Sequence, residues 1–195
     1  MADVRSAFGK NRGMRTVLVA ALFLGLMSSG VSPATADTTI LEKTDERGDV
    51  RLFEDTSISK RKKRSIDIDR ASVVQLDSGR IRFKVRIRKI HRSKRWDQIV
   101  VFSSGVHGGG ETQSNSVVFT TRNRRGAYAY DSRTDANCSL RVKRKRRTVW
   151  VDVPRRCAPS DGDTVDLGTI TSRFRSDENA YSMDLLRLGV FRSPA

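Results

Sequence analysis

The chain has 195 residues, with 38 Lys or Arg against 22 Asp or Glu and a formal net charge of +16 at pH 7. A surface of this sign attracts anionic partners and repels basic ones. Two histidines and two cysteines are present, so a zinc site of ordinary composition is excluded if the cysteines are oxidised.

Residues 1–36 have the features of a cleaved signal peptide. Basic residues precede an uncharged, mostly apolar run, Val17–Met27, and Ala34-Thr35-Ala36 matches the small-residue cleavage signal. The apolar run is shorter than the about 20 residues of a membrane span. We therefore expect export, a mature chain that begins at Asp37, and no membrane span. The leader carries four basic residues and one acidic residue, a net +3, which leaves +13 for the mature chain.

Short β-prone runs separated by turn signals follow the leader, a pattern typical of an all-β sandwich or barrel. We predict an antiparallel β-sandwich of about eight strands over residues 47–191, after a flexible segment at 37–46 and before a tail at 192–195. The predicted strands are Asp49–Phe53, Ile66–Leu76, Arg80–Ile90, Gln98–Ser103, Ser116–Thr121, Ala127–Asp131, Ser139–Arg144, Arg147–Val153 and Thr164–Leu167. Near the C-terminus, both a helix over Asp177–Leu188 and a last strand over Leu185–Phe191 remain open.

In the clearest predicted strand, Arg80–Arg88, apolar and basic residues alternate strictly. The apolar residues, which face the core, are Ile81, Phe83, Val85 and Ile87. The basic residues, which face the other way, are Arg82, Lys84, Arg86 and Arg88. Since cations are not buried unpaired, this face meets water or an anion.

Cys138 and Cys157 are expected to form a disulfide, because exported proteins with an even number of cysteines favour a bridge. A hairpin with its turn at Lys145-Arg146 brings the two cysteines close, and Pro154 ends its ladder. The expected opposite pairs are Val142 and Val149, Leu140 and Val151, Cys138 and Val153, and Arg141 and Trp150. The bridge should stabilise the fold by about 3 kcal/mol.

The hairpin also carries a basic cluster and an outward-facing tryptophan, Trp150. The basic residues are Arg141, Lys143, Arg144, Lys145, Arg146 and Arg147. Together with the four cations of the alternating strand, they form the candidate polyanion-binding set. An exposed Trp150 flanked by cations suits a sugar or aromatic ligand; we favour the alternative, in which Arg141 or another part of the domain covers it.

The hairpin motif resembles that of a known group of proteins. The spacing Cys138…Val149-Trp-Val-Asp-Val-Pro-Arg-Arg-Cys157, after Gly48-Asp-Val50 and Asp69-Arg-Ala-Ser-Val73, is similar to an uncharacterised family of small secreted proteins from high-GC Gram-positive bacteria. The resemblance covers most of residues 45–190 and implies a β-rich secreted fold. It implies no catalytic residues.

We therefore expect a secreted, non-enzymatic β-sandwich, extracellular or non-covalently associated with the cell wall, that binds anionic envelope or extracellular polymers through its basic faces. We expect no metal and no cofactor. A specific nucleic-acid ligand is not expected either, because no aromatic-rich strand interleaves with the basic residues. The oligomeric state is left open.

Two alternatives from other functional classes remain. A glycan hydrolase needs two carboxylates that face each other across a groove, and Asp152, Asp163 and Asp166 are the candidates. A protein-binding or inhibitor module would use the glycine-rich loop Gly105–Asn115. The carboxylates of Ser160–Asp166 also supply part of a calcium shell, but we favour an acidic turn there.

Overall fold

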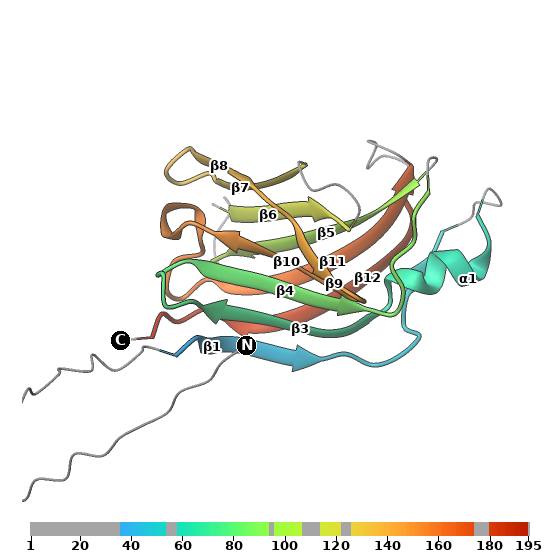
Figure 1. Cartoon of the computed structure of the whole chain (residues 1–195), viewed down its shortest axis with the longest axis horizontal. Helices are drawn as coiled ribbons and strands as arrows, with labels where there is room; N and C mark the ends of the chain where they lie inside the picture. Colours follow the sequence, from blue (N-terminus) through green and yellow to red (C-terminus); the bar gives the residue numbers. More distant parts are fainter. Residues whose placement is uncertain are drawn as a thin grey trace, which may run out of the picture. The chain divides into compact units, whose positions relative to one another are not determined.

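The computed structural model describes residues 36–53, 58–93, 96–106, 114–121, 126–173 and 180–194. Within these residues the chain forms two antiparallel sheets that face each other (Figure 1), which confirms the predicted β-sandwich. The described residues form twelve strands rather than about eight. The expected signal peptide lies outside the described residues, except for Ala36.

The five-stranded sheet has the strand order β1-β3-β4-β10-β9. Its strands are β1 (Thr38–Thr44), β3 (Ile68–Gln75), β4 (Ile81–Ile87), β9 (Lys143–Lys145) and β10 (Thr148–Val153). The prediction of a flexible segment at 37–46 is wrong for β1. Its backbone pairs with β3 from Thr38 to Thr44, and these ladder hydrogen bonds hold an otherwise exposed segment in place.

The seven-stranded sheet has the strand order β2-β12-β11-β5-β6-β7-β8. Its strands are β2 (Arg51–Leu52), β5 (Trp96–Gly105), β6 (Ser114–Thr120), β7 (Ala127–Asp131), β8 (Ala136–Leu140), β11 (Thr164–Arg173) and β12 (Ala180–Val190). The helix considered over Asp177–Leu188 is wrong, because Ala180–Val190 is a strand that pairs with β11 along most of its length.

The core lies between the two sheets, and the alternation of β4 supplies part of it. The predicted inward residues of β4 are at most 1% exposed. Phe83 packs edge-to-face on Phe102 of the opposite sheet, with 5.0 Å between ring centroids, and Phe102 stacks with Phe119 at 6.2 Å. Each such side chain contributes roughly 1.5–3 kcal/mol when fully buried.

Three short helical segments complete the fold: α1 (Lys60–Lys63), η1 (Arg64–Ile66) and η2 (Arg155–Cys157). α1 lies at one end of the strands (Figure 1). Lys63 of α1 is buried and donates a hydrogen bond to the carbonyl of Phe53. No helix among the described residues has the length and apolar character needed to cross a membrane.

The predicted strand Ser139–Arg144 is in fact two strands in different sheets. β8 ends at Leu140 in the seven-stranded sheet, and β9 begins at Lys143 in the five-stranded sheet. The turn of the β9–β10 hairpin falls at Arg146-Arg147 rather than Lys145-Arg146, and the φ of 54° at Arg146 suits a two-residue hairpin turn.

The predicted register of this hairpin is therefore wrong. Arg144 lies opposite Val149, and Lys143, not Arg141, lies opposite Trp150. The predicted burial is nevertheless correct, because all of the expected inward residues are at most 7% exposed. These residues are Cys138, Leu140, Val142, Val149, Val151 and Val153.

Cys138 and Cys157 form the predicted disulfide, with their Cα atoms 6.4 Å apart. Cys138 belongs to β8 of the seven-stranded sheet, whereas Cys157 lies in η2, directly after β10 of the five-stranded sheet. The bond therefore joins the two sheets, instead of closing a simple hairpin as the sequence suggested.

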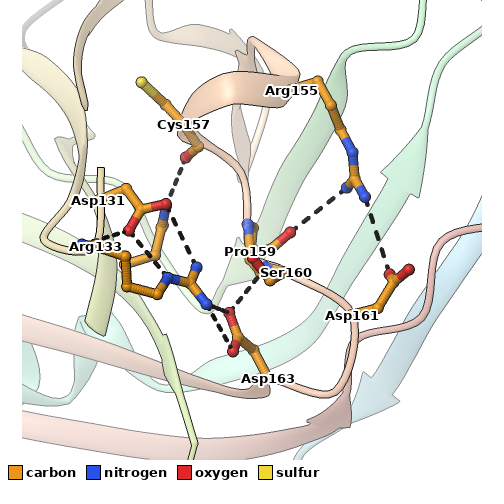
Figure 2. A network of polar contacts seen from close by, with 9 residues as sticks. Asp131, Arg133, Arg155, Cys157, Pro159, Ser160, Asp161 and Asp163 are labelled. Carbon is orange, nitrogen blue, oxygen red and sulfur yellow. Dashed lines mark hydrogen bonds and ion pairs between the residues drawn. The ribbon is translucent and has the colours of Figure 1, made fainter. Parts of the chain in front are cut away.

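A buried ion-pair network lies beside Cys157 (Figure 2). The Arg133 Nε donates to Asp131 Oδ1 at 3.1 Å, and its Nη1 donates to Asp163 at 3.1 Å. The side chains of Asp131 and Asp163 are 6% and 1% exposed. Arg133 thus compensates two buried carboxylates and links the end of β7 to the turn before β11.

Candidate anion-binding surface

The outer face of the five-stranded sheet, together with the β9–β10 hairpin, is the basic face of this protein. The alternation in β4 turns Arg82, Lys84 and Arg86 outward, because the residues between them are in the core. Across the sheet, Lys84 lies opposite Trp150, and Trp150 lies opposite Lys143. Neighbouring strands are about 4.8 Å apart, so these side chains form one continuous surface.

A large cavity of about 640 Å³ lies on this face. It is lined by Arg82, Lys84, Arg86, Lys145, Arg146, Arg147, Thr148 and Trp150. Six of these residues are cationic, and none of the described lining residues is acidic. The cavity is a region of strongly positive potential with a partly apolar wall.

A second, smaller cavity of about 350 Å³ also borders Trp150, at β9 and the residues just before it. It is lined by Arg141, Val142, Lys143, Arg144 and Trp150. The two cavities contain nine of the ten predicted anion-binding cations. The tenth, Arg88, lines a separate cavity of about 120 Å³ together with Asp67 and Asp69.

Carboxylates neutralise part of this cation set. Arg82 and Lys143 both pair with Asp152, at 2.7 and 2.6 Å. Arg86 pairs with Asp69, and Arg88 pairs with Asp67. Six of the predicted cations have no ion-pair partner within the described part of the chain, namely Lys84, Arg141, Arg144, Lys145, Arg146 and Arg147.

Asp152 organises the centre of the basic face, a role that sequence reasoning missed. Two nitrogens of Arg82 donate to its two oxygens, and the Arg82 guanidinium lies 5.9 Å from the centroid of the Trp150 ring. The predicted contact of Arg141 with Trp150 is therefore replaced by a contact of Arg82. Burial by itself would raise the pKa of Asp152, but hydrogen bonds from Arg82 and Lys143 hold this pKa below its usual value.

Trp150 is partly exposed rather than fully covered. Its indole nitrogen is shielded from solvent and has no hydrogen-bond acceptor among the described residues. An unpaired buried donor costs about 1–3 kcal/mol. The position of the Trp150 side chain therefore costs it one hydrogen bond.

The carboxylates considered for hydrolysis do not face one another. Asp152 and Asp166 lie on different sheets and point to opposite outer surfaces, because their strand neighbours are in the core. Asp163 is buried against Arg133. Asp166 pairs with Arg187, and Asp161 accepts hydrogen bonds from Ser193, so the carboxylates of residues 160–166 point to separate partners. The turn covers only the first part of this segment, because β11 begins at Thr164.

The loop proposed for protein binding, Gly105–Asn115, lies mostly outside the described residues, since 107–113 are not described. Its ends belong to β5 and β6, which pair from Ile99 with Thr120 to Gly105 with Ser114. The loop therefore joins two adjacent strands of the seven-stranded sheet.

The structure brings together three other carboxylates, two of which are far from the third in the sequence. Asp45, Asp49 and Asp184 each place an oxygen within 4.8 Å of the others. Asp184 is buried and accepts hydrogen bonds from the backbone N–H groups of Ile68 and Leu185. Burial and, to a lesser extent, the negative charges of Asp49 and Asp45 raise the pKa of Asp184 to about 7.

The raised pKa of Asp184 predicts that the free energy of unfolding falls as the pH rises from about 4 to about 7. The folded protein binds this proton more tightly than the unfolded chain, so its stabilising effect is fully present below about pH 4 and is lost as the pH rises through about 7. Each pH unit between the folded and unfolded pKa values corresponds to about 1.4 kcal/mol. The Asp45→Asn/Asp49→Asn variant should lower this pKa and reduce the loss.

The pKa of Asp184 is measured by NMR titration of its carboxyl carbon, and stability is measured by urea unfolding from pH 4 to 8. The pKa of His91 is lowered, mainly by burial, which favours folding at higher pH and opposes the effect of Asp184. Parent and variant both retain His91, so their difference isolates the carboxylates. An Asp184 that titrates near pH 4 in the parent would disprove this prediction.

Comparisons with protein-family models, curated proteins and solved structures find no match to this chain. The resemblance to an uncharacterised family of small secreted proteins from high-GC Gram-positive bacteria therefore remains a prediction.

Proposed function

We propose that this chain is a secreted, non-enzymatic β-sandwich whose basic face holds it on an anionic polymer of the cell envelope or the extracellular medium. The observation that carries the proposal is the large cavity, in which six cations meet and no described lining residue is acidic. Several of these cations have no carboxylate partner within the described residues, so binding an anion does not require breaking an existing ion pair.

Two further features support binding rather than solubility alone as the role of the charge. The cations converge on one sheet face from β4 and from the β9–β10 hairpin, which are far apart in sequence. Arg82 is already oriented by Asp152, and preorganised charges lose less side-chain entropy on binding. The disulfide is consistent with an oxidising compartment.

Affinity for polygalacturonate and for linear polyphosphate, measured over a range of salt concentrations, tests this proposal. We expect affinity to fall steeply with salt, because the bound polymer releases counterions when cations neutralise it. The variant Lys84→Gln/Lys145→Gln/Arg147→Gln should weaken binding on the order of tenfold or more and should flatten the salt dependence.

The matched control removes the same charge from another surface. Lys60, Arg61 and Lys62 of α1 are exposed and line neither cavity, so Lys60→Gln/Arg61→Gln/Lys62→Gln should change affinity only slightly. Equal losses in both variants would show a net-charge effect rather than a site. Parent protein that binds neither polymer would disprove the proposed function.

A further inference from the structure

Trp150 lines two cationic cavities, and it lies between Lys84 of β4 and Lys143 of β9 in the sheet. The large cavity includes Lys84 and Arg86 of β4 and Lys145 of β9, and the small cavity includes Lys143 and Arg144 of β9. Trp150 lines both cavities, and its side chain is partly exposed. The indole is therefore an apolar wall shared by two groups of cations.

The indole is held in a defined orientation. Arg82 lies against the ring, and two hydrogen bonds to Asp152 fix the Arg82 guanidinium. Val142 also lines the small cavity, but at 5% exposure it belongs mainly to the core. A rigid aromatic side chain provides contact area at a low cost in conformational entropy.

A ligand that fills both cavities must present an apolar surface to Trp150 and anionic groups on either side of it. A chain of acidic sugars has this arrangement, because the C–H face of each sugar ring is apolar while its acidic group projects from the ring edge. Polyphosphate carries the charges but has no apolar face. Surfaces that bind single-stranded nucleic acid stack successive bases on several aromatic side chains, whereas Trp150 is the one aromatic residue among the described lining residues.

We propose that the polymer bound by the basic face is an acidic polysaccharide, with one sugar ring packed on Trp150 and the acidic groups of the adjacent sugars paired with cations in the two cavities. This inference rests on the proposed function and narrows its ligand class. Lys84, Trp150 and Lys143 are opposite one another on adjacent strands, so the row spans about 10 Å. One sugar on the indole and one on each side make a trisaccharide the shortest full ligand.

Calorimetric titration with galacturonate oligomers of two, three and six units, and with linear polyphosphate of matched charge, tests this inference. We expect a marked gain in affinity from two to three sugars and little gain beyond three per site. Trp150→Ala should weaken binding of the trimer and hexamer about tenfold. The affinity of Trp150→Ala for polyphosphate should change less than about twofold. Retained polyphosphate binding would also show that the variant is folded and that its charges are in place.

Two controls make the result specific to the indole. Tyr128 is 45% exposed on the other sheet, so Tyr128→Ala should leave both affinities unchanged. Trp96 is 5% exposed, so a fluorescence change on adding the hexamer should come from Trp150. We expect this change to be absent from Trp150→Phe, which keeps a smaller ring and part of the affinity.

The outcomes separate this inference from the proposed function. If the parent binds both polymers and Trp150→Ala weakens neither, or weakens both equally, the sugar-ring contact is wrong and polyanion binding stands. If single-stranded DNA of matched charge binds more tightly than the hexamer and depends on Trp150, the ligand class is wrong. If the parent protein binds none of these polymers, the proposed function itself is wrong.

Discussion

Replacement of Arg133 by methionine is expected to lower the free energy of unfolding by about 3–5 kcal/mol. Arg133 is the cation between Asp131 and Asp163, whose side chains are 6% and 1% exposed. Methionine retains the apolar stem but leaves both carboxylates buried without a counter-charge, and an uncompensated buried charge is strongly destabilising. Urea unfolding at pH 7 measures the loss as a lower transition midpoint.

The matched control is Arg187→Met, since Arg187 forms an exposed pair with Asp166 and its side chain is 68% exposed. This change should cost less than about 1 kcal/mol. A loss in Arg133→Met no larger than the loss in Arg187→Met would contradict the role assigned to Arg133.

Removal of the disulfide by Cys138→Ala/Cys157→Ala is expected to lower the free energy of unfolding by about 3 kcal/mol. The bond closes a loop between residues separated by 19 positions and restricts the unfolded chain. It also joins β8 in one sheet to the segment after β10 in the other. Guanidinium unfolding of the oxidised parent and of the variant gives the difference directly.

Reduction of the parent protein provides the control for the substituted side chains. Both cysteine residues are buried, at 3% and 0% exposure, so reductant should act slowly on the folded protein and rapidly in denaturant. The reduced parent should unfold at nearly the same denaturant concentration as the double variant. If the variant were as stable as the oxidised parent, the two sheets would not depend on this bond.

Local patterns allowed a large part of the fold to be predicted. Strict alternation in β4 identified its buried and exposed faces, because successive side chains of any strand point to opposite sides. The same parity correctly placed Cys138, Leu140 and Val142 in the core. The compartment inferred from the leader, together with two cysteines, was enough to predict the disulfide.

The same local patterns could not predict which strands pair with one another. The inward parity continues from Cys138 to Val142 although the chain leaves one sheet for the other between Leu140 and Lys143. Both sheets face one core, so periodicity shows that a residue is buried but not which strand lies beside it. Similarly, Leu185, Leu186 and Leu188 have a spacing compatible with a helix, and pairing with β11 decides in favour of a strand.

In the candidate site, too, some features could be predicted from the sequence and others depend on the tertiary structure. The sequence alone determined that Arg82, Lys84 and Arg86 point away from the core and that Trp150 does so too, since both follow from alternation within a strand. The tertiary structure alone decided that β4 lies next to β10, that Asp152 orients Arg82, and that the cations enclose two cavities. It also brought Asp45 and Asp49 to Asp184 across more than 130 residues. Such contacts depend on long-range pairing. The loss of chain entropy in that pairing is offset only by burial of the whole core and not by any local segment.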